Sequence, residues 1–372
     1  MIREKCILFI KKETILSLAA LAALLSAFFI PPDAAYLGYC DSRVLVLLFC
    51  LMAVMGGFRQ IGVFDFLAGL FLQRAGTVRQ LAAALVLLCF FSAMLVTNDV
   101  ALITFVPFTI LLLSRAALSE KIIPIVVLQT IAANLGSMLM PVGNPQNLYL
   151  YTVSDMGLRE FFAVTLPYVG VSFVLLLGIC LLQGRAPVQS AETQRMQIGG
   201  RKLLPLCLLF LLCLLAVFRV LPYLPVFALV LVWFLLCQRG VLRGLDYALL
   251  LTFVFFFILI GNLGRIPLIR EGLQGFLQGR EVLISFLASQ IISNVPAAVL
   301  LSEFTDRYDL LLAGVNIGGL GTLIASMASL ISYKYYAQMP GARKGRYLLH
   351  FTLLNVLFAA ILLGLSAALH RL

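Results

Sequence analysis

Residues 96–105 read VTNDVALITF and place an amide, Asn98, and a carboxylate, Asp99, inside one of the most apolar runs of the chain. The preceding residues are LAAALVLLCFFSAML and the following ones VPFTILLL. A charged group at the centre of a membrane helix costs about 2.5–3.5 kcal/mol on insertion scales, so such a group is by default functional. We therefore expect a break in helical structure here, enclosed by protein or facing water.

The composition is that of a polytopic membrane protein. Of 372 residues, 62% are hydrophobic and 12% charged, whereas a soluble domain carries about 25% charged residues. Apolar runs of about 20 residues indicate spanning helices, and the alternating pattern of barrel strands is absent. The sequence predicts spans near 14–31, 43–58, 160–182, 203–220, 224–238, 246–263 and 347–369.

The start of the chain, MIREKCILFIKKE (1–13), resembles a signal peptide, but no small-residue cleavage site follows the apolar run that ends at Ile30. We expect a retained first helix, a cytoplasmic N-terminus and a multi-pass protein of a bacterial inner membrane. The net charge of +11 is spread in short clusters between apolar runs, which is typical of topology signals. The lipid bilayer is an expected partner, and nucleic acid is not.

The chain also repeats itself. Features recur in the same order when Asp41 is set over Asp246, Thr97-Asn98 over Ser293-Asn294, and Leu135-Gly136-Ser137 over Leu320-Gly321-Thr322. Together with the bias of Lys and Arg toward one side, this order predicts inverted-topology repeats. The predicted parts are an N-terminal transmembrane helix (1–40), a first repeat (41–182), a cytoplasmic linker with connecting helices (183–245), and a second repeat (246–372).

The Ser/Thr-Asn pair of each repeat is expected at the tip of a re-entrant hairpin. Residues 80–96 make only about 25 Å of helix, and the corresponding helix of the second repeat is shorter still. The alternative is two complete crossings, which would leave Asn98 and Asp99 outside the membrane. We predict an all-α polytopic membrane protein with two inverted repeats, each holding a re-entrant hairpin and a broken transmembrane helix.

The broken helices are expected at residues 139–151, LMPVGNPQNLYLY, and 324–336, IASMASLISYKYY. The first contains Pro141, Gly143 and Pro145, which interrupt a helix; the second is expected to break more gently. Helix termini at such breaks present N–H or C=O groups to ions. The alternative for each polar residue is a helix cap or an interhelical hydrogen bond.

Asp99 stands apart, because its partner in the second repeat is Val295. It is expected to bind Na⁺, to carry a coupling proton, or to be a neutral structural acid. A coupling Na⁺ would lie near Asn98, Asp99 and Asn144. No HExxH, GxSxG with partners, or phosphate-binding loop is present, so we expect no enzyme, no catalytic residue, no metal centre and no cofactor beyond the coupling ion.

Four motifs carry a family resemblance: TNDVALITFVPF (97–108), GNPQNLYLY (143–151), SNVPAAVLL (293–301) and GGLGTLIASMASLI (318–331). The chain resembles the ion transporter superfamily, in its arsenite-permease-like and citrate-transporter-like branch related to divalent anion:sodium symporters. The resemblance implies a homodimer and a site for solute and coupling ion. By motif position the implied site residues are Thr97, Asn98, Gly143, Asn144 and Asn147 in the first half and Ser293, Asn294, Thr322, Ser326 and Ser329 in the second.

The expected function is secondary active transport of a small anion, either a carboxylate or an inorganic oxyanion or arsenite-like solute, coupled to H⁺ or Na⁺ by alternating access. The symporters' Ser-Asn-Thr is TND and SNVP here, and the Thr-Pro-Asn run of the second broken helix is missing, which favours the arsenite or proton-antiport side. The alternatives are a Na⁺/H⁺ antiporter and a non-transporting membrane protein.

Overall fold

The computed structural model describes residues 13–63, 66, 76–184, 186–187 and 200–370. Apart from an isolated bridge between Thr77 and Pro187, the regular structure in these residues is helical, which confirms the predicted all-α class. Within the described residues, 7 helices are long and apolar enough to cross a membrane. Outside the described residues lie the basic start of the chain, residues 64–65 and 67–75, and most of the polar linker before residue 200.

The helices follow the predicted spans closely. The first part of the chain forms α2 (Thr14–Phe29), α3 (Tyr36–Tyr39), α4 (Ser42–Gln60), α6 (Val78–Val96), α7 (Asn98–Arg115), α8 (Ile122–Ser137), α9 (Pro145–Val153) and α10 (Leu158–Leu181). The linker forms α11 (Gly200–Val217), α12 (Tyr223–Cys237) and α13 (Arg239–Arg243). The last part forms α14 (Tyr247–Gly264), α15 (Pro267–Leu277), α16 (Glu281–Ile292), α17 (Asn294–Ser302), α18 (Tyr308–Gly318), α19 (Met327–Ala337) and α20 (Lys344–His370).

Two hairpins share an unusual tip. Thr97 alone separates α6 from α7, with φ 76° and ψ 148°, and Ser293 alone separates α16 from α17, with φ 75° and ψ 154°. This region of backbone space is almost reserved for glycine, and a side chain there costs about 1–3 kcal/mol. The same strained geometry at matching positions supports the repeat. The re-entrance of the hairpins, the inversion of the halves and the domain boundaries stay predictions.

The first broken helix is interrupted where the sequence indicates, between the end of α8 at Ser137 and the start of α9 at Pro145. The second broken helix was predicted at 324–336, and this position is wrong. The helix α19 runs without a break from Met327 to Ala337, and the interruption lies before it, at 319–326. The cause is the Gly-rich GGLG stretch, in which Gly321 has φ 108°. Serines do not break α19, because a hydroxyl such as that of Ser332, which donates to the Ala328 carbonyl, bonds within the helix.

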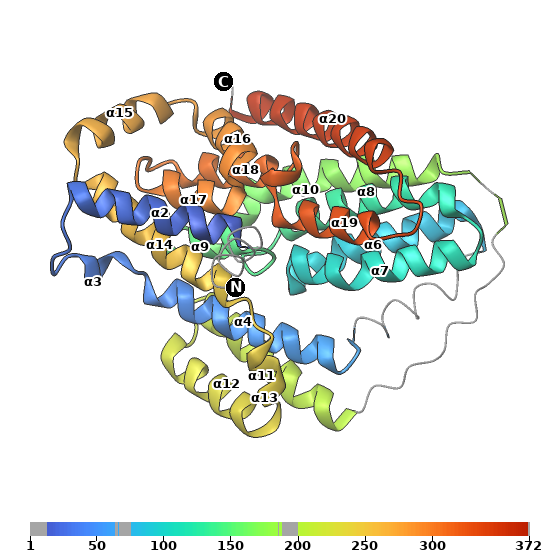
Figure 1. The fold of residues 1–372 in the computed structure, drawn as a ribbon, viewed down its shortest axis with the longest axis horizontal. Coiled ribbons are helices and arrows are strands. Elements are labelled where there is room, and N and C mark those ends of the chain that lie inside the picture. The colour runs from blue at the N-terminus through green and yellow to red at the C-terminus, as the bar shows by residue number, and fades with distance from the viewer. Residues whose placement is uncertain (1–12, 64–65, 67–75, 185, 188–199, 371–372) are drawn as a thin grey trace, which may run out of the picture.

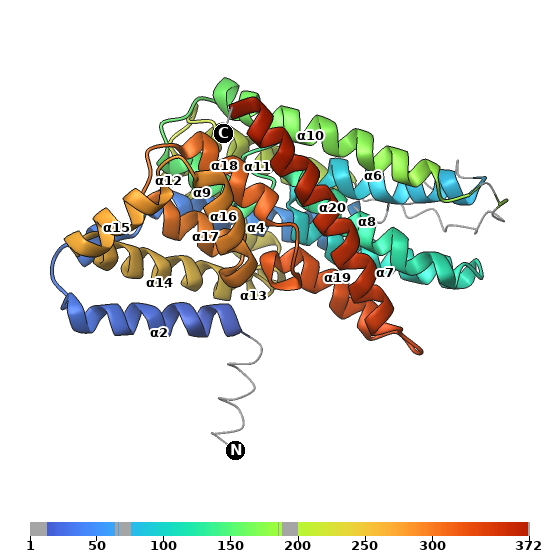
Figure 2. The ribbon, with the colours of Figure 1, turned by 90° about the horizontal axis from the view of Figure 1, so that it is seen from above.

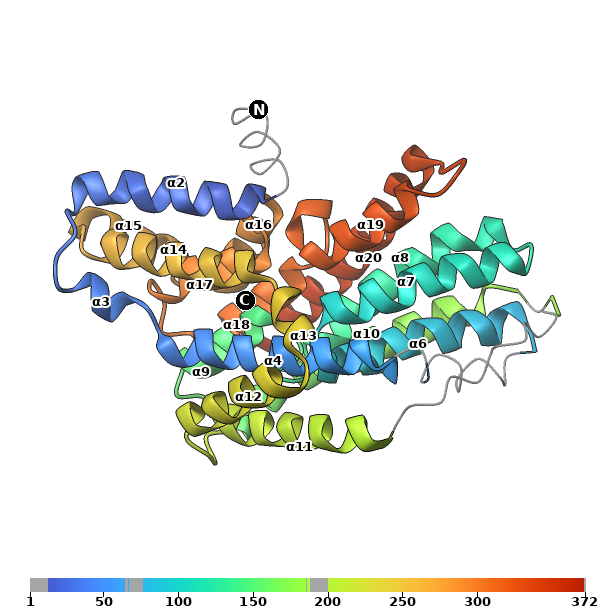
Figure 3. The same ribbon diagram turned by 60° about the horizontal axis from the view of Figure 1, so that its bottom comes forward.

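The two halves interdigitate. The helix after the first break, α9, packs against α17 of the second half, and the helix after the second break, α19, packs against α7 of the first half (Figure 1 and Figure 3). Within each half the hairpin's first helix packs on the helix before the break, α6 on α8 and α16 on α18. The packing is close: a Cβ added at Gly136 on α8 would lie 2.2 Å from the Phe90 carbonyl oxygen. The two breaks therefore meet at the centre of the molecule.

Peripheral helices enclose this centre. In Figure 2, α2 lies beside α14, and Asn262 of α14 donates to the Ser26 hydroxyl at 2.9 Å and the Tyr36 hydroxyl at 2.7 Å. Arg265 pairs with Asp33 at 2.8 Å and holds the pKa of that carboxyl below its usual value. On the other side, α11 and α12 pack against α4.

Arg219, between α11 and α12, holds the far end of α9. Its Nη2 donates to the carbonyls of Tyr151 at 3.1 Å and Ser154 at 2.7 Å. A cation at a helix C-terminus satisfies the last carbonyls and complements the helix dipole. The α9 helix is thereby fixed at both ends, by its N-cap at the central break and by Arg219 at the rim.

Arg219→Met is expected to destabilise the protein by about 1–3 kcal/mol, because charge-assisted bonds to helix carbonyls are lost. Arg219→Lys should recover only part of this, because an ammonium lacks the guanidinium fork. Thermal unfolding in detergent measures the effect, with the exposed Arg346→Met on α20 as the matched control. Equal midpoints for Arg219→Met and Arg346→Met would contradict the role assigned to Arg219.

Candidate functional site

Two cavities lie where the breaks and the hairpin tips meet. The larger, about 590 Å³, is bounded by α4, the tip of the first hairpin and the start of α9. The smaller, about 310 Å³, is bounded by the tip of the second hairpin and the starts of α2 and α19. Six residues line both cavities, so the two are lobes of one candidate site: Asp99, Pro145, Asp246, Leu249, Met327 and Ile331.

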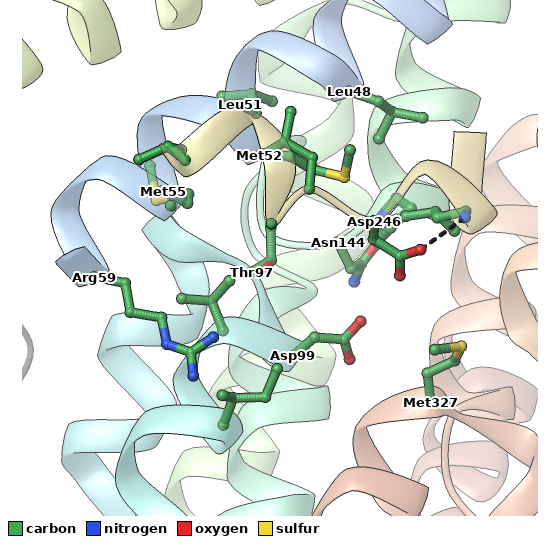
Figure 4. A pocket seen from close by; sticks show the side chains of 18 of the residues that line it. Leu48, Leu51, Met52, Met55, Arg59, Thr97, Asp99, Asn144, Asp246 and Met327 are labelled. Atoms are coloured by element: carbon green, nitrogen blue, oxygen red, sulfur yellow. Dashed lines mark hydrogen bonds between the residues drawn. The ribbon is translucent and has the colours of Figure 1, made fainter. Parts of the chain in front are cut away.

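Asp99 occupies the first turn of α7 and lines both cavities. Its Oδ1 is buried and has no hydrogen-bond partner in the described part of the chain. Asp246, the N-cap of α14, accepts from the Leu249 amide at 2.9 Å through Oδ1. Figure 4 shows both side chains pointing into the same space, with Arg59 of α4 on the other side of Asp99 from Met327. Two carboxylates therefore face one cavity.

The sequence foresaw Asp246 only as a repeat match to Asp41. Both residues cap a helix in the structure, since Asp41 caps α4 by accepting from the Val44 amide at 3.0 Å. Asp246 additionally lines both cavities. Aspartate is a common N-cap residue, so the sequence around Asp246 does not by itself mark this residue as part of a site.

Asn98 joins the first hairpin tip to the first break. Its backbone N–H donates to the Gly143 carbonyl at 3.1 Å, its Oδ1 accepts from the Asp99 amide at 2.9 Å, and its Nδ2 donates to Asn134 Oδ1 at 3.1 Å. The side chain lines the smaller cavity, but both ends of its amide already have protein partners. Thr97 beside it lines the larger cavity.

Asn144 and Asn147 hold the loop of the first break. Asn144 caps α9, its Oδ1 accepting from the Asn147 amide at 2.8 Å, and it lines the larger cavity. Asn147 is 0% exposed, and its Nδ2 donates at 3.2 Å to the carbonyls of Ser137 and Met140. Gly143 leaves no space for a side chain. Asn147 and Gly143 thus shape the break from behind the cavity wall.

The second half contributes Ser293, Asn294 and Ser326 to the smaller cavity. Ser326 is the N-cap residue of α19, and its hydroxyl donates to Asn134 Oδ1 across the halves at 3.0 Å. Ser293 contacts the same break, its hydroxyl lying 3.4 Å from the Ala325 carbonyl oxygen. The tip of the second hairpin therefore meets the second break, as the first tip meets the first break.

Besides Gly143 and Asn147, two further predicted site residues, Thr322 and Ser329, lie off the cavity linings. Thr322 is exposed; its amide donates to Gln290 Oε1 at 2.9 Å, and its hydroxyl donates to the Gln290 carbonyl at 3.2 Å. Ser329 is buried on α19, and its Oγ has no hydrogen-bond partner in the described residues. The displacement of Thr322 follows from the position of the break, which turns this residue outward.

Asn134 and Asn316 are polar residues at the centre that sequence reasoning missed. A signal was present: Asn144 follows Asn134 by ten residues, and Ser326 follows Asn316 by the same interval. Aligning Asn134 with Asn316 also aligns the two N-cap residues, Asn144 and Ser326. The alignment used in the sequence analysis, which sets Gly136 over Gly321, is shifted from this one by three residues, so it did not bring the two asparagines together.

The starts of four helices line the cavities. The first residues of α7, α9, α17 and α19 are Asn98, Pro145, Asn294 and Met327. A helix N-terminus carries about half a positive charge, so four of them offer roughly two positive charges to the cavity. Several of the first N–H groups already have partners: the Asn98 amide donates to the Gly143 carbonyl and the Asp99 amide to Asn98 Oδ1. The attraction of these helix termini for a solute therefore rests mainly on the helix dipoles. Within the described residues, no three His, Cys, Asp or Glu side chains are grouped to hold a metal ion.

Comparison with known proteins assigns the family. The chain matches the citrate transporter family over residues 4–306. It is 32% identical over 327 residues to an uncharacterized transporter of Methanocaldococcus jannaschii, covering 87% of this chain and 88% of the relative. It is 29% identical over 344 residues to the inner membrane protein YbiR of Escherichia coli, covering 91% of each. A shorter match, 30% identical over 44% of this chain and 34% of the relative, is to the silicon efflux transporter LSI3 of Oryza sativa. The chain is therefore a multi-pass membrane transporter that belongs to the citrate transporter family.

Proposed function

We propose that the protein is a secondary active transporter of a small anion, a carboxylate or an inorganic oxyanion or arsenite-like solute, coupled to H⁺ or Na⁺ and working by alternating access. The observation that carries this proposal is the meeting of four helix N-termini at one cavity. N-termini bind anions through their N–H groups and dipoles, and broken helices place such termini at the centre of transporters.

Charged side chains of both signs line the site. Asp99 and Asp246 line both cavities, Arg59 lines the larger one, and Glu13 and Lys334 line the smaller one. With all five ionised, these side chains sum to one negative charge, against about two positive charges from the four helix termini. Protonation of Asp99 makes the field at the site more positive, so anion binding and proton binding favour each other.

A proton is the coupling ion that the geometry favours. The amide oxygens of Asn98 and Asn144 each already accept from a backbone N–H, whereas Asp99 Oδ1 has no partner in the described residues. A Na⁺ ion would need oxygen ligands from several of these groups together. Coupling to Na⁺ therefore remains the second option for this site.

The names of two relatives bear on the solute. One relative is the silicon efflux transporter LSI3 of rice, and another, 26% identical over 137 residues, is the putative transporter arsB of Dictyostelium discoideum. These names, beside the citrate family match, make citrate, arsenite and silicic acid the three probes to test first.

A shift of the melting temperature on ligand binding tests the proposal. Purified protein is screened with citrate, arsenite or silicic acid, with and without Na⁺, at about pH 5 and about pH 8, a range that spans carboxylate titration in buried sites. A ligand at 100 times its Kd stabilises by about 2.7 kcal/mol. Citrate is an anion over this pH range, whereas arsenite and silicic acid are present as the neutral acids, so the screen separates anionic from neutral solutes. We expect at least one of the three to raise the melting temperature, and citrate, if it is the ligand, to do so more at the lower pH. Flux equal to that of the parent in both Asn98→Ala and Asn144→Ala would refute the site assignment.

A cation/proton antiporter is the second candidate, and the two carboxylates facing one cavity are the observation that favours it. Such an antiporter would move protons in vesicles when Na⁺ or Li⁺ is added with no transported anion present. Proton movement under those conditions would replace anion transport as the function. A homodimer and a cytoplasmic N-terminus complete the proposal, and they rest on the family resemblance and on the charge distribution of the sequence.

A further inference from the structure

Asn134 and Asn316 occupy matching places in the two halves. Asn134 lies near the end of α8 and is 4% exposed, and Asn316 lies near the end of α18 and is 2% exposed. Neither lines the cavities described above. Buried amides in a transporter core require partners for both ends, and the partners of these two define their role.

Each amide bonds across to the other half. Asn134 Oδ1 accepts from the Ser326 hydroxyl at 3.0 Å, and its Nδ2 donates to the Gly319 carbonyl at 3.2 Å. Asn316 Oδ1 accepts from Asn144 Nδ2 at 3.2 Å, and its Nδ2 donates to Asn147 Oδ1 at 2.6 Å. Each asparagine thus donates one bond and accepts one bond across the boundary between the halves.

The bonds from Asn134 and Asn316 reach the N-cap residues of two helices that begin at the cavities, α9 and α19. Asn144 is the N-cap of α9, and Ser326 is the N-cap of α19. The helix packing also joins the two halves, since α9 contacts α17 and α19 contacts α7. The start of each of these helices is therefore held by the half to which it does not belong.

We propose that Asn134 and Asn316 are positioning residues that join the two helix breaks into one structural unit. The bonds keep the N-termini of α9 and α19 at a fixed separation, so that a solute meets both at once. The inference rests on the proposed transport function for its consequence, whereas the coupling between the breaks is a property of the folded protein alone.

Hydrogen exchange measured by mass spectrometry tests the coupling without any solute. In Asn134→Ala, amides of the distant break 319–326 are expected to exchange about tenfold faster, because that break loses two cross-half bonds. In Asn316→Ala, the same acceleration is expected at 138–147. The matched control is Asn355→Ala: this asparagine is 0% exposed, and its Nδ2 donates to Phe351 in its own helix.

Acceleration confined to the helix that carries each substitution would overturn the proposal. Ser326→Ala provides a milder variant if Asn134→Ala does not fold, because it removes only the hydroxyl that donates to Asn134, and it should accelerate exchange at the end of α8. The double variant Asn134→Ala/Ser326→Ala should exchange no faster at 319–326 than Asn134→Ala alone, because both substitutions remove the same bond. Additive acceleration would show independent effects and reject the coupling.

Comparing hydrogen exchange with ligand binding, measured by the melting temperature, separates this inference from the proposed function. If exchange is coupled but none of the three probes shifts the melting temperature of the parent, the coupling stands and the function fails. If a probe binds the parent and exchange is uncoupled, the function stands and the coupling fails. Where both hold, Asn316→Ala should bind the solute more weakly than the parent does, whereas the control Asn355→Ala should bind it as the parent does.

Discussion

Asp99→Asn is expected to bind the transported anion at about pH 8 as tightly as the parent protein does at about pH 5, and to lose the pH dependence of transport. The amide has nearly the shape of the protonated acid and cannot ionise, so the positive field of the helix termini persists at every pH. Coupling free energies between sites are about 1–3 kcal/mol, which corresponds to about 5–150-fold in affinity. The measurement is the pH profile of solute flux, with melting temperatures recorded alongside.

Two controls isolate the effect to this carboxylate. Asp306→Asn removes an exposed carboxylate away from the cavities and should keep the parent's profile. Asp246→Asn removes the second cavity carboxylate while keeping a side chain that caps helices well, so it should shift the profile without abolishing it. A profile of Asp99→Asn that matches the parent's would remove Asp99 from the coupling role.

Gly143→Ala is expected to be the most destabilising of the substitutions considered, because the break has no space for a methyl group. A Cβ at this position would lie 2.1 Å from the Ser137 carbonyl oxygen and 2.8 Å from its carbonyl carbon. These are backbone atoms that cannot rotate away. Overpacking costs about 1–3 kcal/mol and more when the backbone must move. We expect a large drop in the melting temperature, together with loss of the bond from the Asn98 amide to the Gly143 carbonyl.

Gly170→Ala is the matched control for this prediction. Gly170 lies in the interior of α10 with nothing within 4 Å of its added Cβ, and alanine in a helix interior is favoured over glycine by about 1 kcal/mol. This variant should therefore match or exceed the parent in thermal stability. A Gly143→Ala protein that melts with the parent would show that the first break is not packed as described.

Local chemistry made much of the architecture predictable. Apolar runs marked the spans, and Pro141, Gly143 and Pro145 marked the first break. The prediction placed the second break at the serines of 324–336. The conformational freedom of the glycines at 318–321 decides instead where the helix ends. Hydroxyl groups that bond inside a helix are compatible with its continuation.

The centre of the site was predictable only in part. Thr97, Asn98 and Asn144 stand in sequences where a polar residue is out of place, and the structure places them at the cavities. Asn134 and Asn316 acquire their role from bonds between residues more than 160 positions apart. The shared ten-residue interval marks the two asparagines as a matching pair, but it does not say which residues of the other half they contact. The interdigitation of the halves likewise depends on contacts that neither repeat makes alone.

The most direct test of the proposed function is solute-driven proton movement in proteoliposomes that contain the purified protein and a pH-sensitive dye. Citrate, arsenite and silicic acid are added in turn without Na⁺. We predict that at least one drives protons across the membrane with the parent protein, and that Asp99→Asn, though folded and able to bind that solute, moves none. Proton movement of equal size in the variant, or movement in the parent that requires only Na⁺ or Li⁺, would contradict the account.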